Sequence, residues 1–82
     1  MLFEFSSHSL EQLNRRSISK DTVELVITKP DVISIEEENQ LIYQKVIENY
    51  LYRVFINNTK SPPLIKTVYK TSKITKYNTH ES

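Results

Sequence analysis

The chain has 82 residues, which suits one small domain, and its 11 basic and 10 acidic residues leave a formal net charge of +1. The absence of cysteine excludes disulfides and thiolate metal sites, and the absence of glycine excludes a glycine-rich phosphate loop. No apolar run approaches the roughly 18 residues of a membrane span and no signal peptide is evident, so we expect a cytoplasmic protein that uses no metal, cofactor or membrane.

A short strand and two short helices are predicted at the start of the chain. Residues 2–5 alternate apolar and polar side chains, as a strand does, and the serines at positions 6 and 7 can cap a helix over residues 8–16. A second helix is expected between Ser19, its N-cap, and Pro30, which stops it. Its apolar residues repeat with the spacing of a buried stripe.

The rest of the chain is predicted to form strands joined by short turns. The predicted strands cover residues 32–36, 41–47, 50–56 and 64–71. Asparagines and prolines are expected to form the turns in place of glycine. We therefore expect an α+β fold, in which a short N-terminal strand and two short helices precede an antiparallel sheet of about four strands. One domain would cover residues 1–77, followed by a polar tail at 78–82.

Charge is distributed unevenly along the chain. Residues 1–42 contain four bases and eight acids, whereas residues 43–82 contain seven bases, two acids and all five tyrosines. Lysine and arginine interleaved with aromatic residues on strands can hold a phosphate backbone and stack a base. The same pattern is typical of a solvated, lysine-rich sheet that resists edge-to-edge aggregation. Charge alone leaves both interpretations open.

Several segments, in order along the chain, resemble one bacterial family of domains of unknown function. The pattern of that family opens with T/S-x-H-A, has an arginine one helical turn later, and continues with R-G-I-S. The matching segments here are FSSHSLEQLNRRSIS (residues 5–19), residues 23–32, YQK (43–45), YRV (52–54), TVY (67–69) and TSKITKY (71–77). The family is similar to the RelE-like toxins and the barnase-like (BECR-fold) small ribonucleases.

The resemblance implies two helices followed by a curved antiparallel sheet. It also implies a small metal-independent ribonuclease toxin of a toxin–antitoxin system, which cleaves RNA by 2′-OH attack. Two departures bear on it. Gln12 stands where an arginine is common, which would weaken phosphate contact if that arginine is functional. Ser17 replaces the glycine after Arg16, so we expect the corner between the helices to need no positive φ.

Three residues are candidates for the central steps of RNA cleavage. His8 is the candidate general base or acid, because histidine exchanges protons readily near neutral pH; a structural role in the helix cap is the alternative. Arg16 and Arg53 are candidate phosphate clamps, since a guanidinium binds phosphate through two hydrogen bonds. Arg53 has the alternative of being a buried residue paired with Glu48 or one of residues 36–38.

The basic C-terminal part supplies further candidates. Lys73 is expected to stabilise charge at the phosphate and Tyr77 to stack or donate a proton; a basic, poorly ordered tail is the alternative. Alternation over residues 64–71 predicts that Val68 shares one face of the strand with Lys66 and Lys70. Tyr69 is predicted on the other face, which is expected to be the core face. The candidate RNA-binding residues are Arg15, Lys45, Lys66, Lys70, Ser72 and Lys76.

Three functions compete on this evidence. The first is the ribonuclease toxin, acting on free or ribosome-associated RNA and neutralised by a cognate antitoxin. An antitoxin would most simply cover the basic sheet with an acidic or amphipathic segment. The second is a non-catalytic module of the same fold that binds nucleic acid or protein, and the third is a structural module whose acidic half pairs with a basic protein. Self-association is left open.

Overall fold

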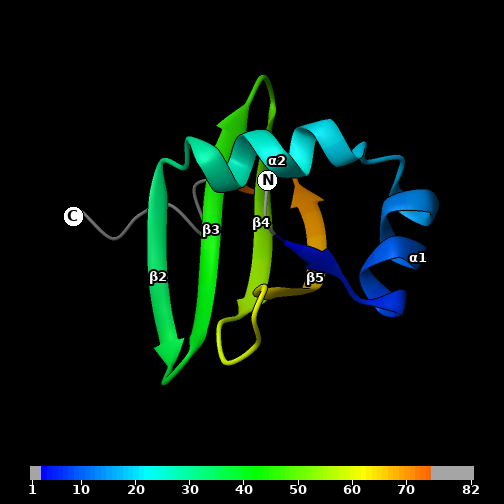
Figure 1. Cartoon of the computed structure of the whole chain (residues 1–82). Coiled ribbons are helices and arrows are strands. Elements are labelled where there is room, and N and C mark those ends of the chain that lie inside the picture. The colour runs from blue at the N-terminus through cyan, green and yellow to red at the C-terminus, as the bar shows by residue number, and fades with distance from the viewer. Residues whose placement is uncertain (1–2, 75–82) are drawn as a thin grey trace.

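The computed structural model describes residues 3–74 as an α+β domain with two helices and one sheet (Figure 1). In chain order the elements are β1 (Glu4–Phe5), α1 (Ser7–Arg16), α2 (Lys20–Thr28), β2 (Val32–Glu37), β3 (Gln40–Ile47), β4 (Tyr50–Asn57) and β5 (Leu64–Thr71). The predicted fold class and the order of elements are therefore confirmed, and most predicted boundaries fall within one residue of the observed ones.

The sheet has the strand order β1-β5-β4-β3-β2. The pairs β2–β3, β3–β4 and β4–β5 are antiparallel, as predicted. β1 adds a parallel partner to β5, with Glu4 opposite Leu64 and Phe5 opposite Ile65. The sheet is thus mixed and has five strands, one more than the antiparallel sheet that the sequence predicts.

Both helices begin at serine caps, as the sequence predicts. The side chain of Ser6 accepts a hydrogen bond from the amide of Ser9, and that of Ser19 accepts one from the amide of Thr22, each at 3.0 Å. These bonds satisfy amides that have no partner within the first turn of a helix. α2 crosses one face of the sheet, whereas α1 lies beyond β5 (Figure 1).

The hydrophobic core lies between α2 and one face of the sheet. Val23 and Val26 of α2 are almost completely buried against this face. Val54 of β4 and Ile65 and Val68 of β5 are the sheet residues with no exposed surface in the same cluster. Full burial of each such side chain contributes about 1.5–3 kcal/mol, so this layer fixes the position of α2 on the sheet.

A bulge in the pairing of β4 with β5 changes which residues of β5 share a face. Phe55 lies opposite Thr67, whereas Ile56 lies opposite Ile65, so Lys66 is the extra residue. Ile65 and Val68 are both in the core as a result. The predicted placement of Tyr69 on the core face is therefore wrong. Val68 shares a face with Lys70, as predicted, but that face is the core face.

Left-handed residues form the tight corners of this glycine-free chain. Ser17, between the helices, has φ 55° and ψ 47°, so the prediction that this corner needs no positive φ is wrong. The next residue closes the helix end, because the amide of Ile18 donates to the carbonyl of Leu13 at 2.9 Å. Asn39 (φ 67°) lies in the turn between β2 and β3, and Glu48 (φ 57°) in the turn between β3 and β4.

Candidate functional site

A row of three polar side chains crosses the sheet on the face opposite α2. Gln44 of β3 lies directly opposite Arg53 of β4, which lies directly opposite Tyr69 of β5. The neighbouring core residue Val54 points to the α2 side, and successive residues of a strand point to opposite faces. The row therefore faces away from the hydrophobic core.

Arg53 is held in place by its two neighbours in this row. Its Nε donates to Oε1 of Gln44 at 2.8 Å, and its Nη1 donates to the hydroxyl oxygen of Tyr69. The guanidinium carbon also lies 5.3 Å from the centroid of the Phe55 ring and 5.6 Å from that of Tyr69. These contacts fix the orientation of a planar cation on a rigid strand.

A second guanidinium reaches the same tyrosine from α1. The guanidinium carbon of Arg16 lies 5.9 Å from the centroid of the Tyr69 ring, and its Nη1 donates to the carbonyl oxygen of Val68 at 3.4 Å. The rings of Phe55 and Tyr69 stack with centroids 6.0 Å apart and an angle of 29° between their planes. The predicted phosphate clamps Arg16 and Arg53 are thus brought together around one aromatic ring.

We call this group the Arg53 cluster. Its five members, from α1 and three adjacent strands, are Arg16, Gln44, Arg53, Phe55 and Tyr69. Two of them are cations and none is acidic, so the group as a whole carries positive charge. An array of guanidinium groups beside aromatic rings is suited to binding a phosphate next to a stacked base.

His8 lies apart from the Arg53 cluster. It is exposed in the first turn of α1, whereas Arg16 is in the last turn. Eight residues of helix separate their Cα atoms by about 12 Å. The structure therefore does not bring His8 and Arg16 together at one point.

Two of the predicted RNA-binding lysines lie on the α2 side of the sheet. Lys45 is opposite Tyr52 and forms an ion pair with Asp31 at 3.5 Å. Lys70 is also opposite Tyr52, on the other side of β4, and its Nζ lies 4.9 Å from the centroid of the Tyr50 ring. These lysines are separated from the Arg53 cluster by the thickness of the sheet.

The other predicted residues have varied positions. Lys66, at the bulge, is exposed and donates to Oε1 of Gln40 at 3.0 Å. Arg15, Ser72 and Lys73 are exposed, and the amide of Lys73 donates to Oγ1 of Thr71. Tyr77 and Lys76 lie outside the described residues.

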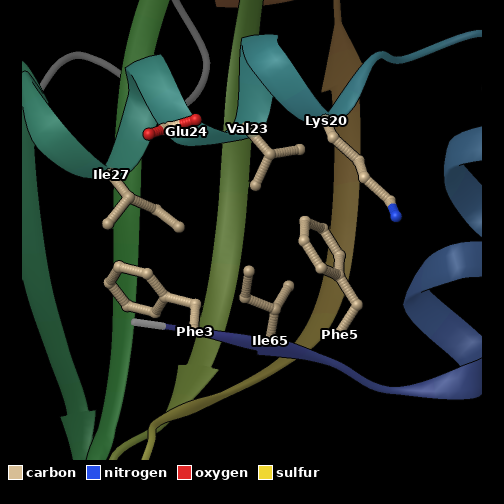
Figure 2. A pocket seen from close by; sticks show the side chains of 7 residues that line it. All are labelled: Phe3, Phe5, Lys20, Val23, Glu24, Ile27 and Ile65. Carbon is tan, nitrogen blue, oxygen red and sulfur yellow. The ribbon is translucent and has the colours of Figure 1, made fainter. Parts of the chain in front are cut away.

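Two pockets in the described part of the chain differ in their distance from the Arg53 cluster. One has a volume of about 240 Å³ and lies between β1 and α2. There Ile27 of α2 points toward the ring of Phe3, and Ile65 lies between Phe3 and Phe5 (Figure 2). Lys20 and Glu24 of α2 also line this pocket. It is mainly apolar. The other, of about 290 Å³, adjoins the Arg53 cluster and is lined by Glu36, Glu37, Gln40, Leu41, Ile42, Phe55 and Lys66. The second pocket extends the candidate site along the sheet from Arg53 toward Lys66.

Two further properties of the described residues concern metal binding and the crossing of membranes. Within residues 3–74, no group of three or more histidine, cysteine, aspartate or glutamate side chains is arranged to hold a metal ion. In the same part of the chain, neither helix has the length and apolar character needed to cross a membrane.

Gln44, Phe55 and Tyr69 are the members of the cluster that the sequence did not predict. Phe55 lies two residues after Arg53 on β4 and shares its face, but an aromatic residue at this spacing does not by itself indicate a functional role. Gln44 could not be recognised from the sequence, since the role of a neutral amide side chain in a strand depends on which residue lies opposite it. Tyr69 was misplaced by the bulge at Lys66.

One family model matches the chain. It is described as a domain of unknown function, DUF4258, and it covers residues 5–70, which include both helices and every member of the Arg53 cluster. No curated protein and no solved structure matches the chain significantly.

Proposed function

We propose that this chain, which belongs to the DUF4258 family, binds single-stranded RNA at the Arg53 cluster. The observation that carries the proposal is the convergence of two guanidinium groups on the ring of Tyr69. A phosphate oxygen pair accepts hydrogen bonds from a guanidinium in its plane, and a base stacks on an aromatic ring next to it. The resemblance to small ribonucleases supports RNA as the nucleic acid.

The surroundings of the cluster suggest the path of the RNA. Lys66 and Phe55 line the pocket that adjoins Arg53. A nucleotide whose phosphate meets Arg53 and Arg16 would place its neighbour over Phe55. Lys66 would attract the next phosphate, against the repulsion of Glu36 and Glu37 in the same pocket. Because all three cations lie on or beside the face opposite α2, the strand would run along that face.

Salt-dependent binding of a labelled RNA tests the proposal. The probe is a fluorescent oligouridine of about 12 nucleotides, measured by anisotropy at several salt concentrations. Arg53→Gln should weaken binding about tenfold or more, which corresponds to about 1.4 kcal/mol. Lys29→Gln removes one exposed positive charge at the end of α2 and serves as the matched control. Equal losses for both variants would refute binding at the Arg53 cluster.

Ribonuclease activity is a second candidate, favoured by the hydroxyl group of Tyr69. This hydroxyl accepts a hydrogen bond from Arg53, so its own proton is directed elsewhere and is available for transfer. In cleavage, the 2′-oxygen attacks phosphorus, the bond from phosphorus to the 5′-oxygen breaks, and the leaving oxygen takes a proton. Tyr69 is our candidate for that proton donor, and Arg53 and Arg16 would stabilise the charge on the phosphorane.

The proton of the attacking 2′-OH also needs an acceptor. The cluster holds neither an imidazole nor a carboxylate, and His8 lies about 12 Å along α1 from Arg16. For this reason we place RNA binding ahead of cleavage. A toxin role in the cytoplasm, neutralised by an antitoxin, remains a proposal that depends on cleavage.

Cleavage is tested by incubating the purified chain with the same RNA and separating the products. A 2′,3′-cyclic phosphate end that disappears with Tyr69→Phe would support the ribonuclease. Intact RNA bound by a folded protein would leave the chain as a binding module. Growth arrest on induced expression, abolished by the same substitution, would extend the support to a toxin.

A further inference from the structure

The edge of the sheet opposite β1 is formed by a strand of six residues, which pairs on one side only among the described residues. β2 (Val32–Glu37) pairs with β3, and it is the last strand in the sheet order, at the left edge of the sheet in Figure 1. Among residues 3–74 no strand lies along its other side. A six-residue edge presents a row of backbone donors and acceptors that can pair with another chain.

Two isoleucines of this edge strand are unusually exposed. Ile33 is 49% exposed and Ile35 is 76% exposed. They lie opposite Tyr43 and Leu41 of β3, on the same side of the sheet as the core. Isoleucine is among the residues most often buried in proteins. Covering both side chains would remove apolar surface from water, which supports an apolar contact on this side of the edge.

The other side of the same strand is polar and acidic. Ser34 lies opposite Ile42, on the face away from α2, and Glu36 and Glu37 line the pocket on that face. The register shift between Ile35 and Glu37 lets two consecutive residues of β2 line the same pocket. With Glu38, these residues form a run of three acids. A cationic partner would meet this side of the strand.

We propose that β2 is a docking edge for a protein segment that binds as a sixth strand, with apolar and basic residues in alternation. Its apolar residues would cover Ile33 and Ile35 on the α2 side, and its lysines or arginines would meet Glu36 and Glu37 on the other side. Backbone hydrogen bonds provide affinity in such strand addition, and the alternate side chains provide specificity. The pocket that Glu36 and Glu37 line also includes Phe55 of the Arg53 cluster, so the two surfaces adjoin on that face. The inference does not depend on RNA binding, because it rests on the free side of β2, its exposed isoleucines and its acids.

Charge favours such a partner over RNA or a second copy of this chain. Phosphates would be repelled by the acidic run. In a symmetric antiparallel pair of β2 strands centred near Ser34, Glu37 would face residues 29–31 of the other copy. That segment holds one lysine, one proline without an amide donor, and Asp31, which is already paired with Lys45. A second copy would therefore complement the acids poorly.

A synthetic peptide tests the docking edge directly. The probe is a capped peptide of about eight residues that alternates lysine and isoleucine, and the control peptide alternates glutamate and isoleucine. Titration into the ¹⁵N-labelled full chain should shift the amide signals of β2 with the lysine peptide and leave them unchanged with the glutamate peptide. Shifts confined to other elements, or concentration-dependent dimerisation without peptide, would overturn the proposal.

N-methylated peptides separate strand addition from simple charge attraction. In an added strand only every second residue directs its backbone amide toward β2. Methylation of that set of amides, which belongs either to the isoleucines or to the lysines, should abolish binding, and methylation of the remaining set should be tolerated. Equal effects of the two methylations would overturn the proposal.

A pair of protein variants supplies the matched control. Ile35→Lys places a charge on the proposed contact and should weaken peptide binding about tenfold, or about 1.4 kcal/mol. Leu10→Lys adds the same charge at an exposed apolar position of α1 and should leave binding unchanged. Both sites are exposed, so both variants should fold; equal binding by the two variants would also contradict the docking edge.

Discussion

Gln12 of α1 accepts a hydrogen bond from the backbone amide of Val68 in β5 at 2.8 Å, across 56 residues of sequence. Arg16, one helical turn later, donates to the carbonyl oxygen of the same residue. β1 pairs with the beginning of β5 only as far as Ile65. Side chains of α1 thus continue the edge pairing of β5 where the backbone of β1 leaves it, and they place Arg16 beside Tyr69.

Gln12→Leu should destabilise the domain, because it leaves the buried amide of Val68 without its acceptor. The expected loss is about 1–3 kcal/mol of unfolding free energy, measured by urea denaturation. Glu11→Leu introduces the same residue at an exposed position of α1 and should have little effect. Equal stabilities of the two variants would show that the bond contributes nothing.

Ser17→Gly should stabilise the domain, because a residue with a Cβ pays roughly 1–2 kcal/mol in the left-handed region. Part of that gain is offset by the greater freedom of glycine in the unfolded chain, so we expect about 0.5–1 kcal/mol. Ser17→Ala keeps the Cβ and should bring no comparable gain. A melting temperature for the glycine variant at or below that of the parent would contradict the left-handed corner.

Lys66→Gln and Lys45→Gln should differ in their effect on RNA binding. Each phosphate contact on a single strand contributes about 0.7 to the slope of log K against log salt. Lys66 lines the pocket beside Phe55, so its removal should reduce the slope. Lys45 lies on the α2 side, paired with Asp31, and its removal should leave the slope unchanged. A salt slope that is reduced by Lys45→Gln and unchanged by Lys66→Gln would place the RNA on the α2 side.

Tyr69→Phe should separate the roles of the ring and of the hydroxyl group. The ring contacts with Arg16 and Arg53 are kept, so RNA binding should fall by less than with Arg53→Gln. Loss of the hydrogen bond from Arg53 should cost about 1.5–3 kcal/mol of stability, as measured by urea denaturation. RNA affinity that falls as far as in Arg53→Gln would show that the hydroxyl, rather than the ring, is essential.

The fold was largely predictable because local signals agree along most of the chain. Ser19 and Pro30 bracket α2 within two residues, and the β-branched segments define four strands. Pairing of β1 was not predictable, since the alternation of residues 2–5 gives no information on its partner or direction. The left-handed Glu48 was also missed, because Asn49 beside it is the residue type that more often adopts positive φ.

The candidate site was predictable only in part. Arg16 and Arg53 stood out as isolated guanidinium groups, and the structure brings them to one ring. Tyr69 was assigned to the core because strict alternation puts it on the same face as Ile65. The extra residue Lys66 at the bulge places Ile65 and Tyr69 on opposite faces of the sheet. The row of Gln44, Arg53 and Tyr69 depends on the register between β3, β4 and β5. That register cannot be predicted from the sequence of any one strand.

The most direct test of RNA binding at the Arg53 cluster is an NMR titration that follows the side-chain Nε–Hε signals of the three arginines. On addition of oligouridine, the signals of Arg16 and Arg53 should shift together and saturate at the affinity measured by anisotropy. Arg15, exposed on α1, is the internal control and should shift little. Bound RNA with unchanged Arg16 and Arg53 signals, or with the largest shift at Arg15, would contradict binding at the cluster.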